Sequence, residues 1–111
     1  MSKVHFFKDQ KECEEFFKLV AKNNNEPFSD DFIFEGNSGM KYEWIREIGE
    51  TLGYNRIGVD SEIRKDADFI DEIFIEITNI DWVCKGIKSR IWIDADEVSI
   101  EPGGYLRLWW D

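Results

Sequence analysis

The sequence predicts an α+β fold in which two helices pack on one face of a four-stranded antiparallel meander sheet. The first half of the chain carries two stretches with apolar residues at helical spacing, whereas the second half alternates apolar and polar residues with a period of two. Of the 111 residues, 42% are hydrophobic, and no low-complexity stretch divides the chain. This apolar content suits one cooperative core, and we therefore expect residues 1–111 to form a single domain.

The first helix is predicted shortly after the N-terminus. Asp9 is followed three residues later by Glu12, which is the spacing of a capping box with Asp at the N-cap. The next apolar residues recur at i, i+3, i+4, i+7 and i+8, and they are Cys13, Phe16, Phe17, Val20 and Ala21. Three asparagines at 23–25, before Pro27, predict the end of this helix. Upstream, residues 4–7 are either a short strand or an apolar arm.

A second helix is predicted in the stretch that ends at Gly53, because glycine suits the residue after the last helical turn. Its apolar residues share one face, and they are Trp44, Ile45, Ile48 and Leu52. A short strand is predicted at 32–34, and a glycine-rich turn at 36–39 separates it from the helix. Such a turn raises the alternative of a phosphate-binding loop, but the segment lacks the pattern G-x-x-x-x-G-K-[ST]. We interpret it as a turn with a helix cap.

The C-terminal half predicts the sheet. Apolar residues alternate with polar or aromatic ones, which is the pattern of half-buried strands. The four predicted strands are 73–78, 87–93, 98–100 and 105–110. Between the last two, Pro102-Gly103-Gly104 fits a tight turn with Pro at i+1 and Gly at i+2. Residues 58–71 are irregular and acidic, which predicts a loop or a short helical turn.

One face of the predicted sheet combines aromatic and charged side chains. If the isoleucines and leucines point into the core, the opposite face carries Phe74, Glu76, Lys88, Arg90, Trp92, Tyr105, Arg107 and Trp109. Antiparallel pairing is expected to set Glu76 against Lys88 or Arg90. Exposed Trp, Tyr and Arg are the residue types that dominate binding hot spots. Three uses of this face stay open: docking of a partner, cover by segment 54–71, or association of two copies in a homodimer.

The net charge of −10 is concentrated in two segments. Residues 60–76 hold seven acidic residues against two basic ones, and residues 94–101 hold four acidic residues and no basic one. Such a charge repels nucleic acid and anionic lipid, and it attracts a basic partner over distances near the Debye length of about 8 Å. We therefore expect a basic protein partner, and neither nucleic acid nor a membrane. For either segment alone, a solvated charged loop is the simpler alternative.

The residues offer little for catalysis or metal binding. His5 is the single histidine, and if it is a flexible N-terminal residue, Ser/His/Asp and Cys/His arrangements are ruled out. Cys13 and Cys84 are expected to be buried thiols rather than a disulfide. Asp94 and Asp96 lie in a dense acidic cluster, but this cluster lacks the further ligands of an EF-hand and the lysine of a metal-dependent nuclease. We expect no enzyme, no metal ion and no cofactor. Because the sequence shows neither a signal peptide nor a membrane span, we expect a cytoplasmic protein.

The whole-chain profile resembles that of the bacterial immunity proteins, which neutralise nuclease toxins of contact-dependent and related polymorphic toxin systems. The resemblance rests on the small size, the two acidic segments and the rings of Trp92, Tyr105 and Trp109. It implies an inhibitor that docks over a cationic toxin surface and blocks the active site or the substrate channel. The residues expected at that contact are Asp68, Asp71, Trp92, Asp94, Asp96, Tyr105 and Trp109. The alternatives are a nucleic-acid mimic that inhibits a defence nuclease, and a small carboxylate-dependent hydrolase.

Overall fold

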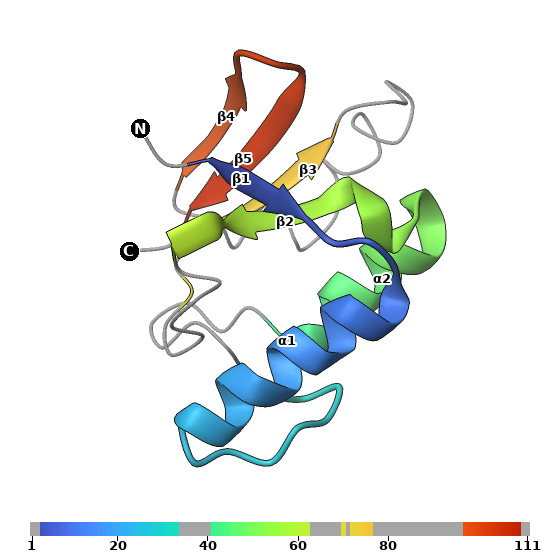
Figure 1. Ribbon diagram of the computed structural model, residues 1–111, viewed down its shortest axis with the longest axis vertical. Coiled ribbons are helices and arrows are strands. Elements are labelled where there is room, and N and C mark those ends of the chain that lie inside the picture. Colours follow the sequence, from blue (N-terminus) through green and yellow to red (C-terminus); the bar gives the residue numbers. More distant parts are fainter. Residues whose placement is uncertain (1–2, 34–40, 63–69, 71, 77–96, 110–111) are drawn as a thin grey trace.

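The computed structural model describes residues 3–33, 41–62, 70, 72–76 and 97–109 (Figure 1). The elements whose bounds lie within these residues are two α-helices, one short 3₁₀ helix and five strands. In chain order they are β1 (Val4–Phe6), α1 (Gln10–Asn23), α2 (Tyr42–Leu52), η1 (Tyr54–Arg56), β2 (Ile57–Asp60), β3 (Glu72–Glu76), β4 (Glu97–Glu101) and β5 (Tyr105–Trp109). Both helices therefore lie in the connection between β1 and β2.

The five described strands form one antiparallel sheet in the order β1-β2-β3-β5-β4. The α+β class, with two helices and an antiparallel sheet, is confirmed, but the four-stranded meander is wrong. β2 extends into residues 58–71, where we expected a loop or a short helical turn, and β1 forms where a strand or an arm was expected. β3 lies between β2 and β5, and β5 lies between β3 and β4, so that the order of the strands in the sheet is not their order along the chain, as a meander would require. The predicted strand 87–93 lies outside the described residues.

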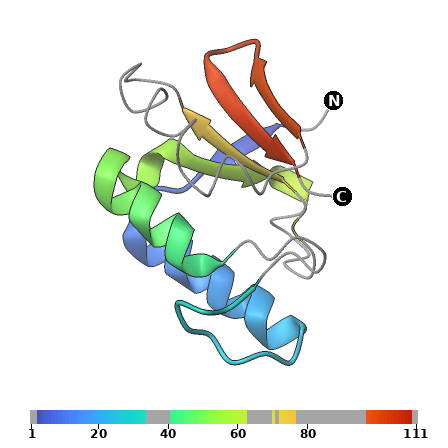
Figure 2. The same cartoon turned by 180° about the vertical axis from the view of Figure 1, so that it is seen from behind.

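One buried cluster contains residues of both helices and of the sheet. The helices contribute Cys13, Phe16, Phe17, Val20, Ala21, Tyr42, Trp44, Ile45 and Ile48. The strands contribute Ile57, Val59, Ile73, Ile75, Leu106 and Leu108. Two opposite views show both helices gathered on the same side of the sheet (Figures 1 and 2). The strand residues between these buried positions therefore point to the other side.

Helix α1 begins and ends where the sequence predicts. The Asp9 carboxylate accepts a hydrogen bond from the backbone N–H of Glu12 at 3.0 Å, as in a capping box. At the other end, Asn25 adopts a φ of 58°, and the backbone N–H of Glu26 donates to the carbonyl of Ala21 at 2.9 Å. This is the Schellman pattern, in which a residue that tolerates the left-handed conformation ends the helix.

Removal of the N-cap side chain is expected to destabilise the protein. Asp9→Ala should lower the free energy of unfolding by about 1 kcal/mol, because the N–H of Glu12 loses its acceptor. Urea unfolding followed by far-UV circular dichroism measures the loss. Asp9→Ser keeps an acceptor oxygen, and its expected loss is less than about 0.5 kcal/mol. Equal losses in the two variants would contradict the capping role.

The helical layer encloses two tyrosine hydroxyl groups. The ring of Tyr54 covers Gly49, where an added Cβ would lie 2.6 Å from the ring. The ring of Tyr42 packs on Phe28, with 4.7 Å between the centroids. Among the described residues, both hydroxyl oxygens are buried without a hydrogen-bond partner. The Tyr42 hydroxyl lies near the Cys13 thiol, but this contact does not reach hydrogen-bond geometry.

The stability of the protein is expected to fall as the pH rises above about 10, the pKa of an exposed tyrosine. Burial, followed by the proximity of Cys13, raises the pKa of Tyr42 and of Tyr54 above that value. The stabilisation is complete below the unfolded-state pKa. Between the two pKa values only the unfolded chain loses these protons, and the free energy of unfolding therefore falls by up to about 1.4 kcal/mol per pH unit for each group.

The measurement is urea unfolding between about pH 8 and pH 11, in the range where tyrosine titrates. The double variant Tyr42→Phe/Tyr54→Phe removes both titrating groups and both unpartnered hydroxyls. It should therefore show a shallower decline of stability with pH, at little cost at neutral pH. A decline as steep as that of the parent protein would show that these tyrosines are not its cause.

Candidate docking face of the sheet

The register of three strands defines the face of the sheet that points away from the buried cluster, which we call the outer face. Along β5, Leu106 and Leu108 are buried, and Tyr105, Arg107 and Trp109 alternate with them. Residues directly opposite each other on antiparallel strands share a face. The outer face therefore also carries Glu72, Phe74 and Glu76 of β3 and Glu97, Ser99 and Glu101 of β4.

Trp109 lies between two glutamates, because its partners in the register are Glu72 and Glu97. Arg107 connects the two carboxylates: its Nε donates to Glu72 Oε2 at 2.6 Å and its Nη1 to Glu97 Oε1 at 2.9 Å. The guanidinium carbon lies 5.9 Å from the centroid of the Trp109 ring. Desolvation alone would lower the pKa of Arg107, but the hydrogen bonds and charges of the two glutamates outweigh it and raise that pKa.

Tyr105 lies between two further glutamates, Glu76 and Glu101, in the same kind of row. The carboxylate of Glu76 forms an ion pair with Arg56 at 2.8 Å. The carboxylate of Glu101 accepts a hydrogen bond from the Ser99 hydroxyl at 2.9 Å. Within the described ranges, no lysine or arginine forms an ion pair with Glu101.

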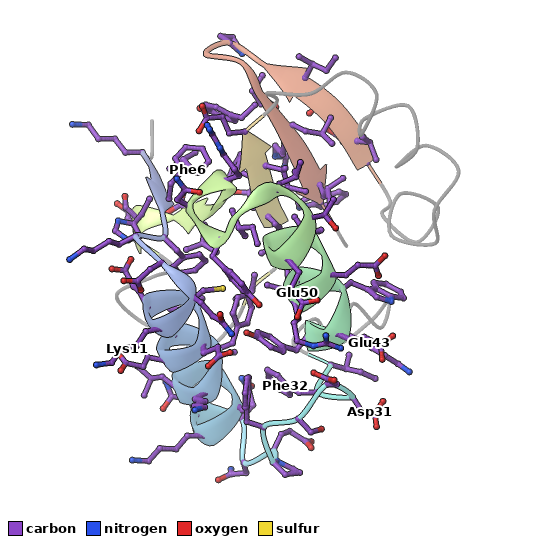
Figure 3. All side chains as sticks on the ribbon, turned by 90° about the vertical axis from the view of Figure 1, so that its right-hand side faces the viewer. Phe6, Lys11, Asp31, Phe32, Glu43 and Glu50 are labelled. Carbon is purple, nitrogen blue, oxygen red and sulfur yellow. The ribbon has the colours of Figure 1, made fainter. Side chains whose placement is uncertain are left out.

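An aromatic cluster fixes the ring of Tyr105. This ring lies edge-on to Phe74, with 5.5 Å between the centroids, and to Phe6 of β1, with 5.9 Å. Phe6 reaches across β2 because Gly58 has no side chain, since a Cβ there would lie 3.0 Å from Phe6 Cδ1. Figure 3 shows Phe6 beside the sheet, far from Phe32 at the lower ends of the helices. Phe74, which we expected to be exposed, is buried.

Two of the seven predicted contact residues can be placed. Tyr105 and Trp109 are both partly exposed, and both lie on the outer face of β5. The other five lie outside the described residues, and they are Asp68, Asp71, Trp92, Asp94 and Asp96. The strand alternation thus correctly placed Tyr105 and Trp109 on the face that points away from the buried cluster.

The prediction for the charge partner of Glu76 was wrong. We expected Lys88 or Arg90 opposite it, but its partner in the register of β5 is Tyr105, and its ion pair is with Arg56. The reason is the strand order, because β3 has β2 and β5 as neighbours.

One alternative that the sequence left open was cover of the outer face by segment 54–71. The described part of that segment does not lie over this face. β2 lies within the sheet beside β3, not across its outer face. The ring that reaches over the outer face comes from β1, because Phe6 contacts Tyr105.

The outer face also carries residues that were predicted neither for this face nor as contacts, among them Phe6, Glu72, Glu97 and Glu101. The sequence held a signal for three of them. Glu72 lies two residues before Phe74, and Glu97 and Glu101 flank the inward positions of a predicted strand. Period-two alternation would therefore have assigned all three to this face. Phe6 had no such signal, because its place depends on strand pairing at the other end of the sheet.

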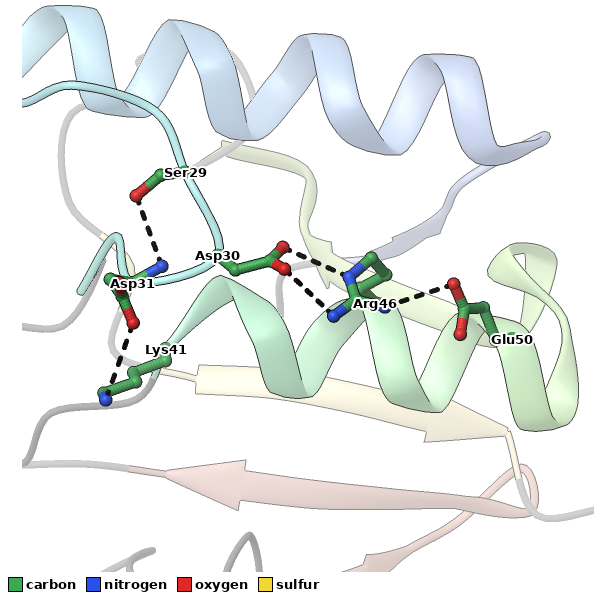
Figure 4. A network of polar contacts seen from close by, with 6 residues as sticks. All are labelled: Ser29, Asp30, Asp31, Lys41, Arg46 and Glu50. Atoms are coloured by element: carbon green, nitrogen blue, oxygen red, sulfur yellow. Dashed lines mark hydrogen bonds and ion pairs between the residues drawn. The ribbon is translucent and has the colours of Figure 1, made fainter.

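A second group of ionic side chains lies at the start of α2 (Figure 4). Arg46 donates to both carboxylate oxygens of Asp30, at 3.1 and 3.0 Å, and forms an ion pair with Glu50 at 3.3 Å. The hydrogen bonds to Asp30 and Glu50 raise the pKa of Arg46. Lys41 lies 3.9 Å from Asp31. The pairs of Asp30 and Asp31 tie the loop before α2 to the start of the helix, the pair with Glu50 lies within the helix, and we assign all three a structural role.

His5 is a strand residue, which corrects the expectation of a flexible N-terminal one. Its Nε2 lies 2.6 Å from Glu12 Oε1, and this contact joins β1 to α1.

In the part of the chain that the structure describes, no three His, Cys, Asp or Glu side chains are grouped to hold a metal ion. None of the described helices has the length and apolar character needed to cross a membrane.

The outer face thus combines fixed rings, a shared arginine and four glutamates on three neighbouring strands. Comparison of the chain with known protein families, with curated proteins and with solved structures finds no match. The geometry of this face is therefore the basis for assigning a function.

Proposed function

We propose that this protein binds a basic protein through the outer face and inhibits it, as the immunity proteins of polymorphic toxin systems do. The observation that carries the proposal is the pair of rings, Trp109 and Tyr105, each set between two glutamates of neighbouring strands. A surface of this kind is complementary to the cationic surface with which a nuclease holds its substrate. Carboxylates that dock there take the positions of phosphates and block access of the substrate.

Charge and rings have separate roles in the proposed complex. The net charge of −10 attracts a basic partner and raises the association rate. The Tyr105 ring is already held by Phe6 and Phe74, so that binding costs it little conformational freedom. The partly exposed Trp109 ring loses its remaining contact with water in the complex, which slows dissociation.

The test begins with affinity capture of the partner from the native source, followed by purification of the captured protein. The proposal expects a basic protein whose association rate constant falls at least about tenfold as salt rises from about 50 to about 500 mM. The dissociation rate should change much less, because it depends on the desolvated centre of the contact. A salt-independent association rate would contradict the electrostatic part of the proposal.

Inhibition is tested separately, by the activity of the captured protein at saturating concentrations of this chain. Full residual activity of the captured protein would contradict an inhibitory role. Turnover of a substrate by this chain alone would instead favour the carboxylate-dependent hydrolase. A mass of two chains in light scattering, sensitive to Trp109→Ala, would favour a homodimer built on the same face.

A further inference from the structure

Residues of β3, β5 and β4 that lie opposite one another in the register form rows across the outer face. Two of these rows have the same arrangement of one ring between two glutamates, but they differ in the arginines that contact them. In the first row Trp109 lies between Glu72 and Glu97, and Arg107 contacts all three residues. In the second row Tyr105 lies between Glu76 and Glu101. The first row therefore provides, within this chain, an example of a guanidinium that contacts a ring of β5 and a glutamate of β4 at the same time.

The second row has one carboxylate that lacks such a cation. Arg56 pairs with Glu76, on the β3 side of the row. On the β4 side, the described partner of the Glu101 carboxylate is the hydroxyl of Ser99, at 2.9 Å. A hydroxyl supplies one hydrogen bond and no net charge, so the remaining acceptor capacity of Glu101 can serve a further donor.

We propose that Glu101 and Tyr105 receive an arginine side chain of the basic partner. This inference rests on the proposed function and names the chemistry of one contact in it. The guanidinium of the partner takes beside Glu101 and Tyr105 the position that Arg107 takes beside Glu97 and Trp109. A planar guanidinium can hydrogen-bond a carboxylate and lie against a ring at the same time, whereas the ammonium of lysine lacks the planar fork.

The local fold holds both receiving side chains in place. The turn between β4 and β5 closes when the N–H of Gly104 donates to the carbonyl of Glu101 at 3.3 Å. Gly103 in that turn has a φ of 106°, and an added Cβ there would lie 3.1 Å from the Tyr105 ring. The ring is thus held between the turn and the aromatic cluster, and a site on rigid elements binds with a smaller loss of entropy.

The test uses a probe of defined composition, the peptide acetyl-Arg-Gly-Arg-Gly-Arg-amide, and its lysine counterpart. Titration is followed by the NMR signals of Tyr105 and of the neighbouring backbone. Two variants change the net charge equally and lie on the same strand and face, Glu101→Gln and Glu97→Gln. Glu97 already has Arg107 as its partner, at 2.9 Å, which makes it the matched control.

The proposal expects Glu101→Gln to weaken arginine-peptide binding at least about fivefold, and Glu97→Gln to weaken it less than about twofold. The lysine peptide should bind the parent protein more weakly than the arginine peptide. Equal losses in the two variants would overturn the site, because they would show a response to net charge alone. Equal binding of the two peptides would overturn the assignment to arginine.

The same variants separate this inference from the proposed function. If a captured basic partner loses affinity with Trp109→Ala but not with Glu101→Gln, the docking face stands and the arginine site is wrong. If no basic protein binds the chain while the arginine peptide still distinguishes Glu101→Gln from Glu97→Gln, the site stands and the proposed function is wrong.

Discussion

Gly58→Val is expected to lower the free energy of unfolding by about 2–3 kcal/mol. A Cβ at this position would lie 2.7 Å from Val4 Cγ1 and 3.0 Å from Phe6 Cδ1, so that these side chains, or β1 with them, must shift. This movement also withdraws Phe6 from the Tyr105 ring. Strand propensity alone predicts the opposite sign, because valine favours strands and glycine weakens them. Urea unfolding measures the change.

A double-mutant cycle tests the physical cause of this loss. Gly58→Ala adds only the Cβ, and its cost should be smaller than that of valine. In a Val4→Ala background the closest atom is absent, and Gly58→Ala should therefore cost less than it does in the parent protein. A neutral or stabilising Gly58→Val would contradict the close approach of β1 to β2.

Arg107→Met is expected to destabilise the protein by about 2 kcal/mol. The side chain of Glu72 is 16% exposed and that of Arg107 is 23% exposed. Loss of the guanidinium therefore leaves a largely buried carboxylate without its cation. Breaking a fully buried pair in this way costs about 3–5 kcal/mol, and the partial exposure reduces that figure. Thermal and urea unfolding at neutral pH measure the loss.

Glu97→Gln is the matched control, because it removes the other ion pair of the same arginine. The side chain of Glu97 is 56% exposed, and an ion pair of that kind contributes less than about 1 kcal/mol. Glu72→Gln in the Arg107→Met background should recover part of the loss, since no buried charge is then left unpaired. If Arg107→Met costs no more than Glu97→Gln, the ion pair of Arg107 with Glu72 is not stronger than its ion pair with Glu97.

Features that depend on neighbours in the sequence could be predicted. Asp9 and Asn25 mark the two ends of α1, and their capping geometry involves residues within a few positions along the chain. The turn after β4 is a further case. Pro102 precedes Gly103, whose φ of 106° is the value that the second central residue of the predicted turn requires.

Features that depend on distant contacts could not be predicted. β2 is short and has only two apolar side chains, Ile57 and Val59, which the neighbouring Gly58 and Asp60 make hard to recognise as a strand pattern. Its assignment depends on pairing with β1, about fifty residues earlier, which no local pattern reports. In the expected strand at 32–34, Ile33 forms an isolated bridge with Lys41, and residue 34 lies outside the described residues.

In the candidate site, too, some features could be predicted from the local sequence, whereas others depend on distant contacts. Alternation along β5 was enough to place Tyr105 and Trp109 on one face. The charge partners required the register, because Arg107 lies thirty-five positions from Glu72 and ten from Glu97. The role of Gly58 in admitting the Phe6 ring depends on a contact between two strands that are not adjacent in the chain.

The central claim is that the outer face docks the partner, and the affinity of two alanine variants for the captured basic protein tests it most directly. Trp109→Ala should weaken binding at least about thirtyfold, as expected for a central ring in an interface. Leu19→Ala removes an apolar side chain that is 45% exposed on α1, and it should leave the affinity unchanged. Unfolding midpoints show that both variants are folded. Equal affinities of the two variants would contradict the claim.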